Sequence, residues 1–414
     1  MTDIALDSIR LTQQRPFVLL CIARLFSTLG YQALTVAIGW SIYDITHNAF
    51  DLGLVGLIQF MPAVVFTLAI GHIADRYDRR LIVRIAQAVS ALAAVTVIAA
   101  LVAHVFSLAL LFGAVFLVGC ARAFEVPTAH ALMPVLVPPS LLPRAVAGWN
   151  TANQTAVICG PALGGLIYAV SPPLVCVMCL VFFTTAITLV TLVKVDRPPP
   201  RREPPTLSSV LAGIRFVRSR ARLLGVISLD LFVTLLGGVT ALLPIYAHDI
   251  LNAGPTGLGL LRSAPAIGAL SMSILLARFP VEAKIGIKMF SVVALYGLAT
   301  IVFSLSTSLP LSMAALAVLG ASDSISVVIR FSLVQIETPD EMRGRVTAIN
   351  SLFVGTSNTL GEFESGMLAG LIGAMPAAFL GGLGSLLVAG IWMWLFPDLR
   401  RLDRFQPANE AKRA

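Results

Sequence analysis

Long apolar runs of close to twenty residues, separated by short polar stretches, fill most of this 414-residue chain. A helix of about 20 apolar residues crosses the hydrocarbon core of a bilayer, and these runs lack the alternation of membrane strands. Hydrophobic residues form 57% of the sequence and charged residues only 12%. That charged fraction is about half of what a soluble protein carries. We therefore expect an integral membrane protein of the all-α class.

The apolar runs predict twelve transmembrane helices. Their expected ranges are 16–43, 50–74, 81–103, 106–128, 144–170, 174–194, 222–247, 256–278, 285–306, 309–334, 342–371 and 374–396. An even number of spans places both termini on the same side of the membrane.

The placement of Lys and Arg predicts which side that is. The six loops that join odd to even spans contain neither residue, whereas the termini, the even-to-odd loops and the central linker contain most of them. Loops rich in Lys and Arg stay in the cytoplasm. We expect both termini to be cytoplasmic and the protein to lie in a bacterial inner membrane, with no cleavable signal peptide.

The chain divides into two similar halves around a basic, proline-rich linker. We expect a six-helix bundle over 1–194, a linker over 195–221 and a second bundle over 222–414. Residues that recur after about 200 positions support a repeat: Tyr43 with Tyr246, Gly56 with Gly259, Pro62 with Pro265, Pro139 with Pro339, Val146 with Val346 and Asn150 with Asn350. Residues 207–218 have the pattern of an amphipathic surface helix, although a solvated linker with no binding role is the simpler interpretation.

A short charged stretch between the second and third runs has the pattern Gly-x3-Asp-Arg-x2-Arg-Arg, formed by Gly71, Asp75, Arg76, Arg79 and Arg80. It resembles the loop signature of the major facilitator superfamily. The superfamily usually has glycine where this chain has Asp78, so we expect Arg79 or Arg80 to hold the turn here. The resemblance implies two pseudo-symmetric six-helix bundles and a cytoplasmic gating loop.

The fifth run contains Gly160-Pro161-Ala-Leu-Gly164-Gly165, which resembles the end of the antiporter motif of the same superfamily. Proline removes a backbone hydrogen bond and small residues permit close helix packing, so simple packing is the alternative to a functional kink. Arg122 on the fourth run resembles an arginine linked to proton coupling in drug antiporters. Glu125, three residues later, is close enough to pair with it.

Further segments resemble the bacterial branch of the superfamily that includes the enterobactin exporter. They are Tyr43–Thr46, Leu52–Gly56, Asp75–Arg80, Thr338–Val346 and Ser357–Gly366. The resemblance implies export of a small amphiphilic, siderophore-like or drug-like molecule by alternating access, in exchange for protons.

Charged and polar side chains within the runs are the candidates for a proton or substrate pathway, because a charge at the bilayer centre costs about 2.5 kcal/mol or more. The candidates are Asp230, Glu362, Arg24, Arg122, Arg262, Asp323, Arg330, Asn358 and Gln32. Asp230 and Glu362 lead as proton carriers. The alternatives are structural ion pairs, of Asp230 with Arg262 or Arg330 and of Glu362 with Arg24.

The eleventh run begins at Thr338-Pro339-Asp340-Glu341, and we expect Thr338 to cap that helix. The amino end of a helix is electropositive. A gating hypothesis follows, in which Asp75 docks near this helix end, or near Arg343 and Arg345, when the cytoplasmic side closes. Local pairing of Asp75 with neighbouring arginines is the alternative.

The sequence also argues against several other functions. It lacks a nucleotide-binding phosphate loop, a zinc-protease helix and a hydrolase elbow, so we expect no enzyme, cofactor or metal. Cys176 and Cys179 are expected to be packing residues. We expect membrane lipid, a small-molecule substrate and protons as partners, no nucleic acid, and a monomer. A metabolite importer and a receptor or scaffold that transports nothing stay open as alternatives to an exporter.

Overall fold

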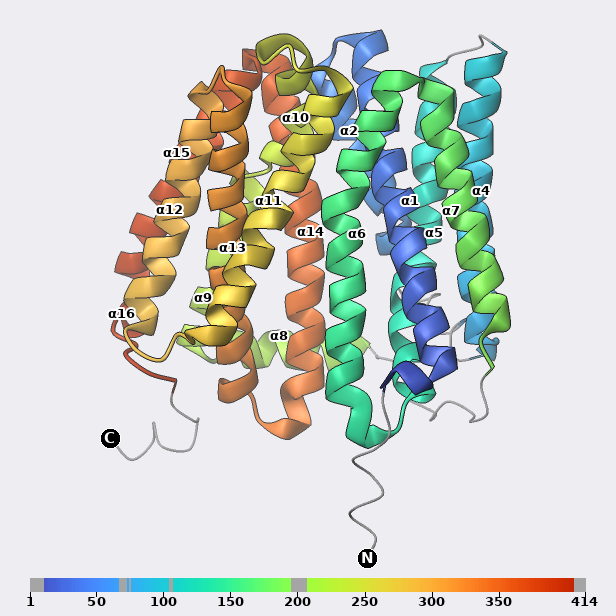
Figure 1. Ribbon diagram of the computed structural model, residues 1–414. Helices are drawn as coiled ribbons and strands as arrows, with labels where there is room; N and C mark the ends of the chain where they lie inside the picture. The colour runs from blue at the N-terminus through green and yellow to red at the C-terminus, as the bar shows by residue number, and fades with distance from the viewer. Residues whose placement is uncertain (1–10, 67–72, 74–75, 104–106, 195–206, 406–414) are drawn as a thin grey trace, which may run out of the picture. The chain divides into compact units, whose positions relative to one another are not determined.

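A computed structural model describes residues 11–66, 73, 76–103, 107–194 and 207–405, and contains no strand among them (Figure 1). The chain separates into two compact units. Unit 1 comprises residues 1–42 and 58–204, and unit 2 comprises 43–57 and 205–414. The end of the first helix and the start of the second therefore belong to unit 2.

In the described residues up to position 194, the chain forms six long helices. They are α1 (Arg15–Thr46), α2 (Ala49–Val65), α4 (Arg79–Val102), α5 (Leu108–Leu132), α6 (Leu142–Val170) and α7 (Pro172–Leu192). Short 3-10 turns η1 (Leu11–Gln13), η2 (Met133–Leu136) and η3 (Pro139–Leu141) flank them. The core of unit 1 is apolar, with Phe17, Trp149 and Val190 among its most buried side chains.

After the part of unit 2 formed by residues 43–57, its next described element is an amphipathic helix, α8 (Leu207–Arg218), which confirms the predicted helix at these residues. The long helices that follow are α9 (Ala221–Leu236), α11 (Gly254–Arg278), α12 (Ile285–Leu305), α13 (Leu309–Glu337), α14 (Asp340–Ile372) and α15 (Ala374–Leu395). Short elements are η4 (Val239–Leu242), α10 (Leu243–Ile245), η5 (Tyr246–Ile250) and α16 (Pro397–Arg400). Leu223, Phe290 and Ile329 belong to its fully buried core.

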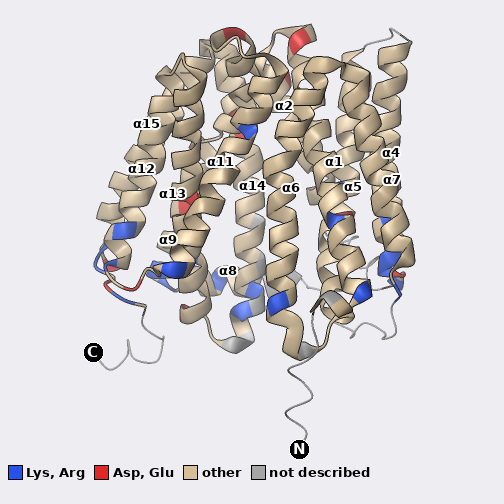
Figure 2. Ribbon diagram, viewed as in Figure 1, with Lys and Arg blue, Asp and Glu red and all other residues tan. Residues whose placement is uncertain are grey.

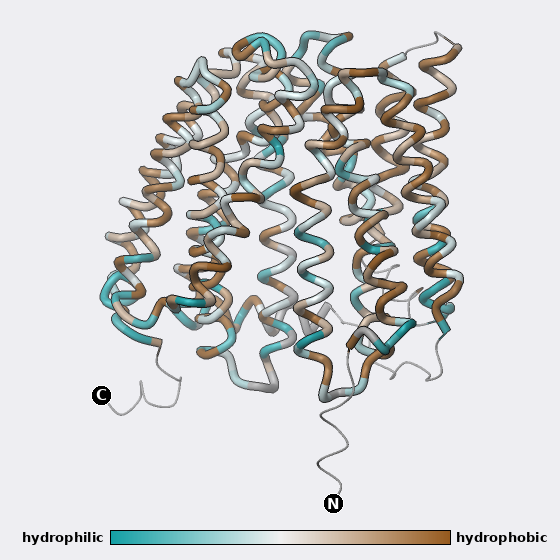
Figure 3. Tube along the Cα trace, viewed as in Figure 1, coloured by the Kyte–Doolittle hydropathy of each residue, from teal (hydrophilic) through white to brown (hydrophobic). Residues whose placement is uncertain are grey.

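The helices agree with the predicted spans. Within the described residues, nine helical segments are long and apolar enough to cross a membrane. The other three predicted ranges are occupied by α2, α6 and α14, whose crossing of the membrane stays a prediction. Figure 3 shows apolar residues along the helices of each unit, and Figure 2 shows Lys and Arg gathered mainly towards one end of them. The fold is thus that of an all-α membrane protein.

The predicted span over 222–247 corresponds to one apolar segment, Ala221–Ile250, but this segment is not a single regular helix. The regular helix α9 ends at Leu236, and Gly237 and Gly238 separate it from η4, α10 and the π-helical turn η5. The break lies against other helices: the Tyr296 hydroxyl donates to the Gly237 carbonyl at 3.2 Å. A side chain on Gly238 would clash with the Gly361 carbonyl. Close packing against α12 and α14 therefore selects glycine here, and glycine ends the helix.

The predicted cap of α14 is also wrong. The helix begins after Pro339 without a side-chain cap, and the buried Thr338 hydroxyl makes no hydrogen bond to the described residues. Pro339 itself occupies the N-cap position, one residue before the first helical residue, Asp340.

Candidate polar site in the membrane helices

A buried carboxylate, Glu125 of α5, is the centre of the polar side chains in unit 1. Its side chain is 1% exposed. Oε1 accepts hydrogen bonds from the Ser27 hydroxyl at 2.5 Å and from Gln87 Nε2 at 3.1 Å. Oε2 lies 3.8 Å from Arg122 Nη1 and accepts no hydrogen bond from the described residues. Three helices, α1, α4 and α5, thus contribute to one buried acidic site.

Two arginines extend this site in unit 1. The Arg122 guanidinium lies over the ring of Tyr31, 4.2 Å from its centre, and Tyr31 accepts a hydrogen bond from Gln59 at 2.9 Å. Arg24 is buried and donates to Asn153 Oδ1 at 3.0 Å. We call the set of Arg24, Ser27, Tyr31, Gln59, Gln87, Arg122, Glu125 and Asn153 the Glu125 network. The pairing predicted for Arg122 and Glu125 is present.

The glycines of α6 allow this helix to pack closely on α1. A β-carbon on Gly160 would lie 2.6 Å from Gln32 Cβ, and one on Gly164 would lie 2.7 Å from Ala33 Cα. Gly165 is buried as well, and α6 continues through Pro161. Close packing therefore explains the small residues of the motif, and it sets Gln32 against Gly160 rather than within the Glu125 network.

A buried ion pair, between Asp230 and Arg330, is the main charged contact inside unit 2. The two side chains are 8% and 5% exposed, and they join α9 to α13. The structure therefore contains one of the structural pairs predicted for Asp230. A carboxylate held by a buried guanidinium is a poor candidate for exchanging protons, because its loss of charge would leave the arginine unpaired.

Glu362 lies beside the break that follows α9. Its backbone N–H is next to Gly238, and a β-carbon on Gly56 would lie 3.1 Å from Glu362 Oε2. Arg262 of α11 is near enough to interact electrostatically with this carboxylate. A discontinuous helix and a half-buried carboxylate therefore meet within unit 2, an arrangement found where transporters bind substrates or ions.

Two further predicted pathway residues, Asp323 and Asn358, are not part of the Glu125 network, the Asp230–Arg330 pair or the contacts of Glu362. Asp323 and Asn358 are exposed, and the charge of Asp323 acts on Tyr296. Arg24 and Glu362 each have a partner within their own unit, Asn153 and Arg262 respectively. A direct pair between Arg24 and Glu362 stays a prediction.

The charged stretch before α4 is partly described. Gly71 and Asp75 lie outside the described residues, and Arg76 is exposed. Asp78 caps α4 by accepting from the Arg80 backbone N–H at 2.9 Å, and the Arg80 guanidinium binds the same carboxylate at 2.7 Å. Arg80 also donates to the Val193 carbonyl, and Arg79 donates to the Ala131 carbonyl. With a φ of −59°, Asp78 needs no glycine, and Arg80 holds the turn as expected.

Several members of the Glu125 network were not predicted. Ser27, Gln87 and Asn153 are uncharged polar residues within membrane spans, and nothing in their sequence neighbourhood indicates a partner on another helix. The sequence provides only a general indication for these residues, namely that a polar side chain inside a membrane span needs a partner.

Comparison with known proteins gives the relatives of the chain. Curated relatives include the enterobactin exporter EntS of Citrobacter koseri, 26% identical over 396 residues, and that of Escherichia coli, 25% identical over 397 residues; each comparison covers 94% of both chains. The apolar helices and these bacterial relatives support a multi-pass protein of the inner membrane.

Solved structures give the same fold. A variant of the nucleoside transporter NupG matches with a TM-score of 0.71 and 12% identity, over 92% of this chain and 100% of that one. A bacterial homologue of the iron transporter ferroportin matches with a TM-score of 0.70 and 17% identity, over 95% and 100%. At such identities the likeness concerns the fold alone.

The family model of the Major Facilitator Superfamily matches residues 20–362, which is most of the chain. This chain therefore belongs to the Major Facilitator Superfamily and is a membrane transporter rather than an enzyme.

Proposed function

We propose that this transporter exports a small amphiphilic molecule, siderophore-like or drug-like, from the cytoplasm in exchange for protons. The observation that carries the direction and the substrate class is the similarity to enterobactin exporters over 94% of both chains. The mostly apolar spans suit an amphiphilic cargo better than a sugar or an ion. The termini and the Arg76–Arg80 stretch face the cytoplasm in this proposal, and the protein acts as a monomer.

Proton coupling is assigned to the buried carboxylates. A buried carboxylate avoids the cost of its charge by taking up a proton. Glu125 suits this role, because Oε1 is held by two donors while Oε2 accepts no hydrogen bond from the described residues. Arg122, at 3.8 Å, stabilises the ionised form. Glu362 is the corresponding candidate in unit 2.

The proposed direction and coupling are tested with purified protein in liposomes. An acid interior should drive accumulation of an added substrate, and a protonophore should abolish it. Enterobactin and a panel of amphiphilic drugs are the probes. Accumulation that is indifferent to the pH gradient would contradict antiport, and transport of polar metabolites alone would favour an importer.

The role of Glu362 is tested by comparing two neighbouring carboxylates of α14. Glu362→Gln should abolish gradient-driven accumulation while substrate exchange at equal pH continues. Glu364→Gln is the matched control, because Glu364 is also half-buried but its described contact is with the adjacent Ser365 hydroxyl. Equal effects of both substitutions would remove Glu362 from the proton pathway.

A further inference from the structure

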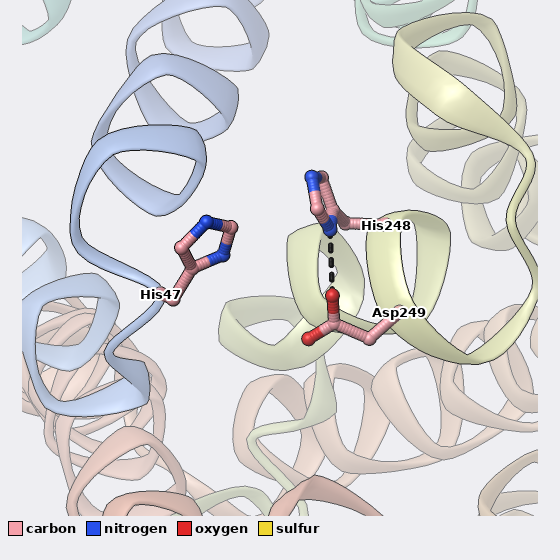
Figure 4. Close-up of side chains that lie close together, drawn as sticks. All are labelled: His47, His248 and Asp249. Atoms are coloured by element: carbon pink, nitrogen blue, oxygen red, sulfur yellow. Dashed lines mark hydrogen bonds and ion pairs between the residues drawn. The ribbon is translucent and has the colours of Figure 1, made fainter.

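Two histidines and an aspartate meet in unit 2, and none of them belongs to the sites described above. The side chains of His47, His248 and Asp249 each place a potential ligand atom within 4.8 Å of the other two (Figure 4). His47 follows α1, and the other two residues belong to the π-helical turn η5. Nδ1 of His248 is hydrogen bonded to Asp249 Oδ1 at 2.6 Å. Elements about two hundred residues apart thus build one cluster.

Neighbouring side chains orient two of these three groups. The Tyr43 hydroxyl donates to Asp249 Oδ2, and the Asp44 carboxylate lies 3.5 Å from His248 Nε2. The rings of Tyr43, His47 and His248 contact one another edge to face, with centres 5.4 to 5.8 Å apart. A ligating histidine in a metal site commonly has a carboxylate at its other ring nitrogen, which is the arrangement of Asp44 and His248.

The backbone at this cluster departs from regular structure on both sides. His47 has a φ of 45°, in the left-handed region that few residues other than glycine adopt. Single π-helical turns such as η5 are rare in proteins and are frequent at functional sites. Both departures aim imidazoles at the same place, as a binding site requires.

We propose that His47, His248 and Asp249 bind one divalent transition-metal ion of the zinc class. Two imidazoles and a carboxylate suit zinc and its neighbours, whereas calcium and magnesium prefer oxygen ligands alone. Ligands of one zinc ion lie about 3.3 Å apart, so a modest rotation of the exposed His47 side chain completes the site. The ion displaces the proton of the hydrogen bond between His248 Nδ1 and Asp249 Oδ1, which is released to solvent, and water completes the coordination of the ion.

The site is accessible and its effect on the protein is local. Both His47 and Asp249 are exposed and His248 is half-buried, so an ion can enter from water. A bound ion would tie the end of α1 to η5, and both segments belong to unit 2. From the sequence we expected no metal. The two histidines are far apart along the chain, so no local metal-binding spacing indicates this site.

Calorimetric titration of the full-length purified protein with zinc chloride tests the proposal, using an affinity tag without histidines. We expect one equivalent to bind. His47→Ala and His248→Ala should each weaken binding by at least about tenfold, and Tyr43→Phe, which removes an orienting contact, by about tenfold. His130→Ala is the matched control, because His130 packs on Trp149 in unit 1, and it should bind zinc as the wild type does.

X-ray absorption spectroscopy at the zinc edge supplies a second measurement on the same samples. The proposal predicts nitrogen and oxygen ligands, with the scattering pattern of two imidazoles. Thermal unfolding of each variant without zinc confirms that the variants are folded. Absence of saturable binding, undiminished binding by both His47→Ala and His248→Ala, or sulfur ligands from the cysteines would overturn the proposal.

Discussion

At the scale of single residues, the buried carboxylates of the two units have different kinds of partner. In unit 2, Asp230 and Arg330 neutralise each other directly. In unit 1, Glu125 lies near Arg122 and accepts hydrogen bonds from two neutral donors on one oxygen. Its other carboxylate oxygen accepts no hydrogen bond from the described residues. Loss of charge on one member of a tight buried ion pair leaves the other uncompensated, whereas a carboxylate held mainly by neutral groups can change its charge at lower cost. This contrast is why we assign proton exchange to Glu125 and a structural role to Asp230.

The structural role of Asp230 predicts a large loss of stability in Asp230→Asn. Removing one partner of a buried ion pair costs about 3–5 kcal/mol, because the remaining charge is uncompensated. The double substitution Asp230→Asn with Arg330→Met should recover much of this loss. Thermal unfolding in detergent measures both, with the exposed Asp398→Asn as control. Equal stability of Asp230→Asn and the control would contradict the assignment.

Asp78 predicts a pH-dependent contribution to stability. Hydrogen bonding from Arg80 holds the pKa of this carboxyl below its usual range. A lowered pKa in the folded state stabilises the protein at pH values above the unfolded pKa of about 3.9, and this contribution disappears as the pH falls through the lowered pKa. Because Asp78 is partly exposed, we expect less than about 1 kcal/mol.

Two substitutions separate the charge of Asp78 from its cap. Asn caps helices as well as Asp does, whereas Ala does not, at a cost of about 1 kcal/mol. Asp78→Asn should therefore be slightly less stable than the wild type at pH 7, and the difference should shrink as the pH falls through the lowered pKa of Asp78. Asp78→Ala should be less stable than Asp78→Asn at neutral and at acidic pH. A difference between wild type and Asp78→Asn that persists at low pH would be inconsistent with the ion pair.

At the scale of elements, the packing of α6 on α1 rests on small residues. Gly160→Ala and Gly164→Ala should each destabilise the protein by about 1–3 kcal/mol, because a methyl group would overlap α1. Gly113→Ala in α5 is the matched control, since a β-carbon there meets no atom within 4 Å. Thermal unfolding of the three variants tests the packing, and a loss in Gly113→Ala as large as in Gly160→Ala would refute it.

Hydropathy and charge predicted the helices of the fold well, because membrane thickness and backbone hydrogen bonding leave few alternatives. The break at Gly237 and Gly238 was missed, since both glycines lie inside an otherwise apolar run and the reason for them is the approach of α14. Two pairs were predicted: Arg122 with Glu125, which are near in sequence, and Asp230 with Arg330, because a charge inside a membrane span needs a partner. The partners of Glu125 on α1 and α4, and the meeting of His47 with His248, depend on tertiary packing that no local pattern encodes.

At the scale of the whole molecule, membership of the Major Facilitator Superfamily gives the transporter its general function. Exporter relatives cover nearly the entire chain, so the proposal of export does not depend on a single motif. To this general function we add the proposal of a specific proton site in unit 1. The central claim is that ionisation of Glu125 couples the pH gradient to substrate movement.

The most direct test compares gradient-driven accumulation with substrate counterflow in liposomes containing Glu125→Gln. The substitution keeps the size of the side chain and removes its exchangeable charge. We predict loss of gradient-driven accumulation with counterflow preserved, whereas Ser27→Ala, which removes only a donor to Glu125, should retain both activities at reduced rate. Gradient-driven accumulation by Glu125→Gln at the wild-type level would contradict the claim.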